Sequence, residues 1–198
     1  ALFDKFDIEV IATTESPLDT LEHHAQIASS GWNGRVITTY RPDVVIDPEN
    51  PDFLENLKAF SETTDEDALT WAGYLNAHRK RRRDFIAHGA TASDHGHPSA
   101  RTENLSDSAA QDLFASALRD PADPKIAEAF RAQMLTEMAK MSMDDGLVMQ
   151  IHPGSYRNHH AGMQGLYGPN VGFDIPAPTN YVHALQPMLE EVGLERDL

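Results

Sequence analysis

The chain has 198 residues and a formal net charge of −15 at pH 7. Its length suits one sizeable domain but falls short of the roughly 250 residues of a (β/α)8 barrel. Its acidic character argues against general binding to nucleic acid. It has no cysteine, which excludes disulfides and thiolate metal sites, and it has no apolar run of about 18 residues, so no transmembrane helix is expected.

Apolar or β-branched stretches that end beside proline or glycine alternate along the chain with amphipathic stretches. The first kind predicts strands at 8–14, 35–40, 85–93 and 147–151. The second kind predicts helices at 18–29, 53–60, 63–83, 108–118, 126–143 and 179–192. Irregular segments are expected at 44–52, 98–107 and 159–178. The last of these is rich in glycine and proline and follows a strand end, as functional lids often do.

This alternation of strands and helices predicts an α/β fold made of right-handed parallel β/α units. Four such units make either a small open sheet or about half of a larger barrel. We expect a single domain over 1–198, with a helical excursion at 44–84. The first residues lack the basic and apolar regions of a signal peptide, so none is expected.

Charged residues stand where each predicted strand ends. Glu15 follows the first strand, Arg41 the second, Asp94 and His95 the third, and His152 the fourth. The carboxyl ends of parallel strands meet at one edge of a sheet, and ligands bind there. These polar groups therefore predict one shared site. The strand that ends at His152 is expected to be buried on both faces.

The loop after the fourth strand adds Arg157 and Asn158 to the polar groups of this site. A small anionic substrate needs local arginines to offset the acidic field of the protein. Arg41 and Arg157 stand where such arginines would be useful. The alternative for Arg41 is an ion pair with Asp43 or Glu15, and the residues alone leave both interpretations open.

Two other patterns favour a structural interpretation. The basic cluster 79–83 is interpreted as the solvated face of a helix rather than a patch for nucleic acid. The methionines at 134, 138 and 141 share one side of a predicted helix, and we interpret them as core filling rather than as a cofactor site.

His95 and His97 stand two residues apart, a spacing that suits a pair of metal ligands on a strand. The alternative is that Asp94 and His95 orient neighbouring loops, or line the pocket, without a metal. The residues themselves do not decide between these interpretations.

Several stretches together resemble the uronate isomerases (glucuronate isomerases) of the amidohydrolase superfamily. The matching stretches are 12–17, 21–24, 40–43, 89–98, 138–158 and 174–176. They run in the family's order and span nearly the whole chain, which makes the resemblance specific. Two small departures are Glu15-Ser16, where the family usually has two acidic residues, and His160, where it often has asparagine.

The resemblance implies that the four strands are strands two to five of a distorted (β/α)8 barrel more than twice as long as this chain. The family's His-x-His metal pair lies on strand one and its aspartate ligand on strand eight. A divalent metal, zinc by expectation, would therefore belong to the full-length protein, with no metal ligand in this chain. For that reason we favour the interpretation of His95 and His97 without a metal. The resemblance also implies a cytoplasmic homo-oligomer that acts on a small-molecule uronate. No nucleic-acid or membrane partner is expected.

The implied reaction is aldose–ketose isomerisation, D-glucuronate to D-fructuronate or D-galacturonate to D-tagaturonate. It needs a base, an electrophile for the carbonyl and a clamp on the remote carboxylate. A bidentate arginine–carboxylate pair is a natural clamp. The candidate catalytic residues are His152, Asp94 and His95. The candidate substrate-binding residues are Arg41, His152, Arg157 and Asn158.

Two competing functions stay open. One is a metal-dependent hydrolase of the same superfamily, and the other is a folded segment without catalysis. The isolated chain is expected to be inactive, because the metal ligands and two catalytic strand ends of the implied barrel lie outside it. Because half a barrel exposes strand edges, the isolated chain is also expected to self-associate.

Overall fold

The computed structural model describes residues 2–169 and 171–194. Its strands are β1 (Ile11–Glu15), β2 (Val36–Tyr40), β3 (Ala92–His95), β4 (Val148–Ile151), β5 (Ser155–Tyr156) and β6 (Ile175–Pro176). Its helices are α1 (Leu2–Lys5), α2 (Glu22–Ser29), α3 (Asp43–Ile46), α4 (Phe53–Thr64), α5 (Trp71–Ala87), α6 (Asp107–Arg119), α7 (Pro124–Asp145), α8 (Ala161–Tyr167), α9 (Tyr181–Ala184) and α10 (Gln186–Val192).

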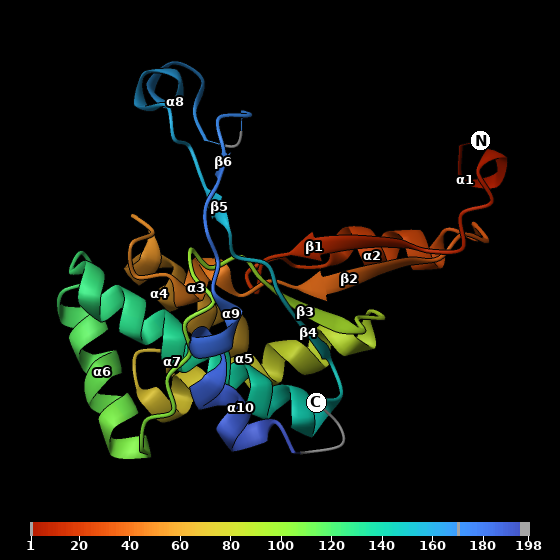
Figure 1. Ribbon diagram of the computed structural model, residues 1–198. Helices are drawn as coiled ribbons and strands as arrows, with labels where there is room; N and C mark the ends of the chain where they lie inside the picture. The colour runs from red at the N-terminus through yellow and green to blue at the C-terminus, as the bar shows by residue number, and fades with distance from the viewer. Residues whose placement is uncertain (1, 170, 195–198) are drawn as a thin grey trace.

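Strands β1 to β4 form a parallel sheet in the order β1-β2-β3-β4 (Figure 1). The registers place Glu15 opposite Tyr40, and His95 opposite Ile151, so the carboxyl ends of the strands lie at one edge. Helices lead from each of these strands to the next. The prediction of an α/β fold with parallel β/α units is confirmed. Sequential strand order is also the order of a barrel.

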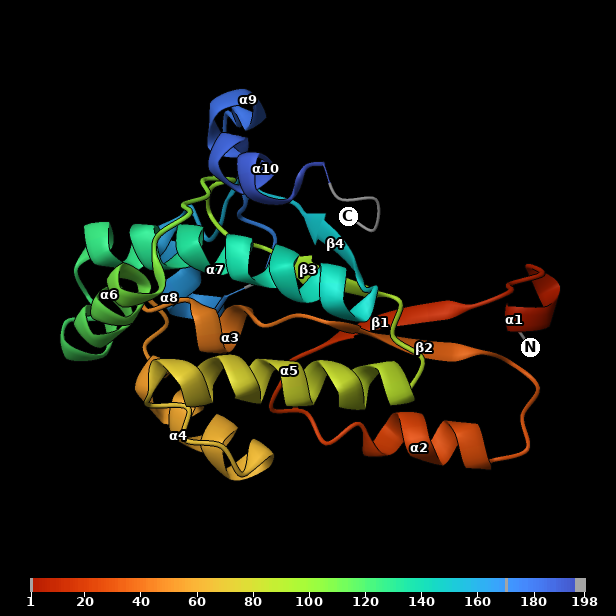
Figure 2. The same ribbon diagram turned by 90° about the horizontal axis from the view of Figure 1, so that it is seen from below.

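The core lies between the sheet and the long helices. Figure 2 shows α2, α5 and α7 running alongside the strands, and α5 packs on β2 while α7 packs on β4. Tyr74 of α5 stacks on Phe114 of α6, which stacks in turn on Phe130 of α7. The methionines at 134, 138 and 141 are buried in this core, so their structural interpretation is confirmed.

The third strand is shorter than predicted. Phe85 was expected to begin a strand, but it lies in the last turns of α5, buried against the ring of Tyr40. The helix ends at Ala87, and Gly89 then turns the chain with a φ of +91°. Only Ala92–His95 pairs as a strand. A short apolar run fits a buried helix as well as a strand, and in this protein tertiary packing selected the helix.

The interpretation of the basic cluster 79–83 as a solvated face is wrong for two of its members. Arg82 is fully buried and pairs with Asp145, with Arg82 Nε 2.5 Å from Asp145 Oδ2. Arg81 is also buried and donates to the carbonyl of Pro17 over 2.9 Å. Arg83 alone in the cluster is exposed. These contacts tie α5 to α7 and to the loop after β1, so Arg81 and Arg82 serve packing.

Burial of the sheet falls off at its two edges. Strands β2 and β3 are almost wholly buried, but Ile11 of β1 is 38% exposed and Val148 of β4 is 64% exposed. The expectation that 147–151 is buried on both faces is therefore wrong beyond Leu147. The cause is position, because β4 is an edge strand with a neighbour on one side only.

Two segments are more structured than predicted, and one predicted helix is divided. The segment expected to be irregular at 44–52 begins inside α3, and the long loop 159–178 contains α8 and β6. Strand β6 pairs antiparallel with β5, and this hairpin with α8 projects away from the body of the molecule (Figure 1). The last predicted helix is divided into α9 and α10. Within the part of the chain that the structure describes, no helix is both long and apolar enough to cross a membrane.

Candidate active site

Three charged side chains from three strand ends meet at one edge of the sheet. Arg41 follows β2, Asp94 belongs to β3 and His152 follows β4. Arg41 Nε donates to Asp94 Oδ2 over 2.8 Å, and Arg41 Nη2 contacts the same oxygen. His152 Nε2 lies 2.8 Å from Asp94 Oδ1. The parallel sheet thus brings together three of the predicted site residues.

Asp94 holds the other two side chains of this cluster. Its side chain is 8% exposed, whereas those of Arg41 and His152 are each 40% exposed. His152 Nε2 lies within ion-pair distance of Asp94 Oδ1, and it also lies 3.4 Å from Arg41 Nη2, which can donate a hydrogen bond to it when this ring nitrogen carries no proton. A buried carboxylate therefore orients a guanidinium and an imidazole that remain accessible to a ligand.

The ion-pair partner of Arg41 differs from the two that the sequence suggested. Glu15 accepts a hydrogen bond from Thr38 Oγ1 and lies 3.7 Å from His24 Nε2, so it belongs to a separate contact between β1 and α2. Asp43 faces Gly96 instead. The partner of Arg41 is Asp94, from the neighbouring strand.

Asp43 is the residue that sequence reasoning missed as a site residue. It is the first residue of α3, and its carboxylate accepts the N–H of Gly96 over 3.1 Å. Burial raises the pKa of this carboxyl to about 6. A Cβ atom on Gly96 would lie 2.8 Å from Asp43 Oδ2 and 3.1 Å from His152 Cε1, so this approach requires a glycine. The signal in the sequence that points to Asp43 is its position two residues after Arg41, at the end of a strand.

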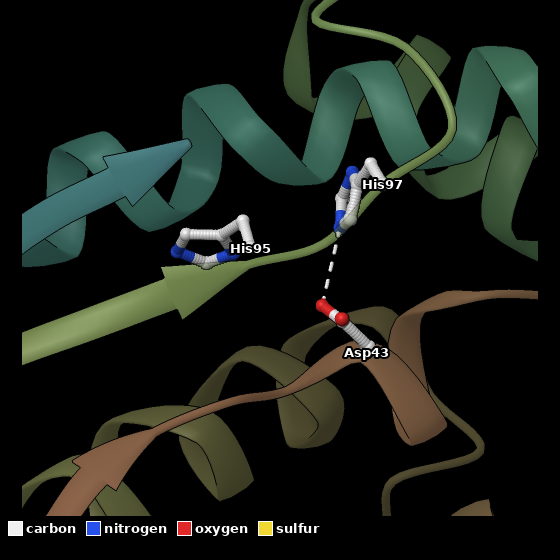
Figure 3. Close-up of side chains that lie close together, drawn as sticks. All are labelled: Asp43, His95 and His97. Carbon is white, nitrogen blue, oxygen red and sulfur yellow. Dashed lines mark ion pairs between the residues drawn. The ribbon is translucent and has the colours of Figure 1, made fainter. Parts of the chain in front are cut away.

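His95 and His97 lie deeper than the cluster of Arg41, Asp94 and His152. His95 is fully buried and His97 is 4% exposed. Burial lowers the pKa of His97 to about 3 and that of His95 well below its usual value, so both rings are neutral. With Asp43 they form a group whose potential ligand atoms all lie within 4.8 Å of one another (Figure 3). Such a group could hold a metal ion.

Arg157 and Asn158 follow β5, in the projecting hairpin. Arg157 Nη1 lies 3.5 Å from Asp174 Oδ2, and the backbone N–H of Asn158 donates to Asp174 Oδ1 over 2.9 Å. Both residues line a groove of about 570 Å³ that Gly96 also lines. The structure therefore places them on the wall of a groove that reaches Gly96, the neighbour of His152, but Arg41, Asp94 and His152 are not among the described residues that line it. Arg157 also has an ion-pair partner of its own.

The whole chain is similar in sequence to proteins of one known family. The family model described as glucuronate isomerase matches residues 1–198. The chain belongs to the glucuronate isomerase family. Uronate isomerases of Xanthomonas oryzae pv. oryzae and Mesorhizobium japonicum are 61% and 60% identical to it, over 98% and 100% of the chain. The resemblance seen in the sequence is thereby confirmed.

Solved structures of glucuronate and uronate isomerases share the fold of this family member. The crystal structure of glucuronate isomerase from Caulobacter crescentus matches with a TM-score of 0.97 and 56% identity, over 100% of the chain and 41% of that structure. Uronate isomerase from Thermotoga maritima matches with a TM-score of 0.88 and 27% identity, over 96% and 43%. The chain spans about 41% of the length of the curated relatives it matches.

Proposed function

We propose that this chain is the central segment of a hexuronate isomerase, which interconverts D-glucuronate and D-fructuronate, or D-galacturonate and D-tagaturonate. The observation that carries the proposal is the meeting of Arg41, Asp94 and His152 at one sheet edge, in a chain of the glucuronate isomerase family. The groove that Gly96, Arg157 and Asn158 line, at about 570 Å³, has the volume of a small-molecule site.

The first proposed role is a clamp on the uronate carboxylate. Arg41 presents a guanidinium that is 40% exposed, with its Nε and Nη2 held by Asp94, and its exposed part is placed to meet an anion. Arg157 and Asn158 face the groove from the projecting hairpin. Two guanidinium groups on one carboxylate would fix the sugar acid in place, and orientation supplies a large share of the barrier reduction in such reactions.

The second proposed role is proton transfer and polarisation at the reacting carbons. The isomerisation moves a proton from C2 to C1 while the carbonyl moves from C1 to C2. His152 Nε2 lies 2.8 Å from Asp94 Oδ1, so this pair is placed to relay a proton, and a protonated His152 can donate a hydrogen bond to a developing oxyanion. His95 borders the pair as a neutral imidazole. We assign Asp94, His95 and His152 to this step.

The divalent metal that the family resemblance implies has its own ligands on strands outside this chain. Both carboxylate oxygens of Asp94 are engaged by Arg41 and His152, so this cluster fits a substrate clamp and offers no free carboxylate oxygen to an ion. A bound metal would supply Lewis acidity at a substrate oxygen. The roles proposed for Arg41, Asp94 and His152 do not depend on it.

The architecture of the full-length protein is part of the proposal. Apolar side chains on both edge strands, Ile11 on β1 and Val148 on β4, are exposed in this chain. Further strands that pair with these edges would bury both, as closure of a (β/α)8 barrel does. We infer that β1 to β4 are strands two to five of such a barrel, within a cytoplasmic homo-oligomer. On this proposal the isolated chain is inactive.

A substrate screen of the full-length protein tests the proposed function. The protein is incubated with D-glucuronate, D-galacturonate, a hexuronate lactone and a simple amide, and the products are identified by NMR. Formation of the ketose acids supports the proposal. Hydrolysis of the lactone or amide without isomerisation would overturn it and favour the metal-dependent hydrolase.

A further inference from the structure

Asp43, His95 and His97 come together from two segments that are distant in the chain. His95 ends β3, His97 lies two residues further on, and Asp43 begins α3 after the neighbouring strand β2. Figure 3 shows the carboxylate of Asp43 directed at the ring of His97, with His95 beside them on β3. Their potential ligand atoms lie within 4.8 Å of one another. This distance suits side chains arranged around one small cation.

Three of the four ring nitrogens of these histidines lack a hydrogen-bond partner among the described residues, and the fourth, His95 Nε2, lies 3.2 Å from Ser93 Oγ. His95 Nδ1 and both ring nitrogens of His97 are buried without a hydrogen bond. His97 Nε2 lies 3.8 Å from Asp43 Oδ1, which is too long for a hydrogen bond. A buried polar atom without a partner is costly, and each such atom requires an explanation. Coordination to a shared ion would supply the missing partner.

We propose that Asp43, His95 and His97 bind a divalent transition-metal ion at a site made entirely by this chain. Two imidazoles and one carboxylate form a donor set that suits Zn²⁺ and related first-row ions. This ion is additional to the metal that the family resemblance implies, since that metal has its ligands on other strands. The proposal does not rest on the proposed isomerase activity.

The electrostatic surroundings support the site. A metal ligand must be a neutral imidazole or an ionised carboxylate, and burial already keeps both imidazoles neutral. The carboxylate of Asp43, whose pKa is raised by burial, is the acidic member of the group and would pair with a divalent cation. Asp43 also keeps its hydrogen bond from Gly96, which orients the carboxylate.

The site is tested by titrating the metal-free 198-residue chain with ZnCl2 and with CoCl2. Calorimetry follows the binding of Zn²⁺, and visible absorption reports the ligand field of Co²⁺. We expect saturable binding of one ion per chain. His97→Ala and Asp43→Asn should each weaken binding by more than about 100-fold. His23→Ala, in a side chain that is 80% exposed, is the matched control and should bind as the unaltered chain does.

Two outcomes would overturn the proposal. One is the absence of saturable binding to the folded chain, and the other is equal binding by the unaltered chain and both ligand variants. If the isolated chain or a variant does not fold, the metal content of the full-length protein decides the matter. There, His97→Ala should contain one ion fewer than the His23→Ala control, and an equal content contradicts the site.

Discussion

His152 Nε2 lies 2.8 Å from Asp94 Oδ1, across the edge where β3 and β4 end. The other oxygen of the same carboxylate accepts from Arg41, which follows β2. Asp94 is therefore the residue on which the positions of both neighbours depend. It is also the least exposed of the three, so its contacts with Arg41 and His152 are poorly replaced by water.

Replacement of Asp94 by asparagine should damage catalysis more than binding. Asp94→Asn keeps the shape of the side chain but removes the negative charge that holds Arg41 and His152. We expect kcat for D-glucuronate in the full-length enzyme to fall by about 100-fold or more. Steady-state kinetics measure this effect. The exposed Asp112→Asn on α6 is the control, and an equal kcat in the two variants would remove Asp94 from the catalytic groups.

Replacement of Arg157 by methionine should act mainly on substrate binding. The Arg157 side chain faces the groove and is 47% exposed, so its loss should leave the fold intact. Loss of one charge-assisted contact predicts a KM for D-glucuronate that is raised by about tenfold or more. The exposed Arg83→Met is the matched control. A KM that stays at the control value means that Arg157 is not part of the clamp.

Gly96 should tolerate no side chain. The Cβ atom of Gly96→Ala would lie 2.8 Å from Asp43 Oδ2 and 3.1 Å from His152 Cε1, so both side chains must move. Overpacking of this kind costs about 1–3 kcal/mol of unfolding free energy, which urea denaturation of the chain would measure. Gly165→Ala on α8 has no atom within 4 Å of its new Cβ and is the control. Equal stability of the two variants would contradict this packing.

His78 should make the stability of the chain sensitive to acid. It is fully buried with Nδ1 2.8 Å from the hydroxyl of Tyr40, and burial lowers its pKa well below 6.5. Below about pH 6.5 His78 takes up a proton in the unfolded chain but stays neutral in the folded chain. The contribution of neutral His78 to the free energy of unfolding is therefore complete above that pH and is lost as the pH falls. The predicted slope is about 1.4 kcal/mol per pH unit for this proton.

The measurement is urea denaturation at pH 7 and at about pH 5.5. His78→Gln should show a smaller loss of unfolding free energy on acidification than the unaltered chain. The exposed His23→Gln should show the same loss as the unaltered chain, because the other buried histidines contribute equally to both. If His78→Gln and His23→Gln lose the same free energy, His78 is not the source of the acid sensitivity.

The parallel sheet and the cluster at its edge could be predicted because they follow from local pattern. An apolar stretch that ends in a charged residue marks the carboxyl end of a strand, and parallel strands bring such ends together. That rule was enough to place Arg41, Asp94 and His152 at one edge. The rule does not specify which charged side chains at that edge form ion pairs with one another. For that reason it did not predict Asp94 as the partner of Arg41.

Other features depend on contacts that spacing does not encode. Asp43 approaches His97 because α3 begins directly after β2 and because Gly96 leaves room for its carboxylate. Arg82 is buried because Asp145, at the end of α7, lies beside it. Phe85 lies in α5, where its ring packs against that of Tyr40. In each case the side chain contacts a residue that is distant in the chain.

The most direct test of the central claim is the KM for D-glucuronate of Arg41→Met in the full-length enzyme, compared with Arg41→Lys and with the exposed Arg119→Met. If the strand-end cluster grips a uronate carboxylate, Arg41→Met should raise KM by about 10- to 100-fold, and Arg41→Lys should restore part of the loss because it keeps the charge without the planar fork. A folded Arg41→Met enzyme with the KM of Arg119→Met would contradict the assignment of this cluster to substrate binding.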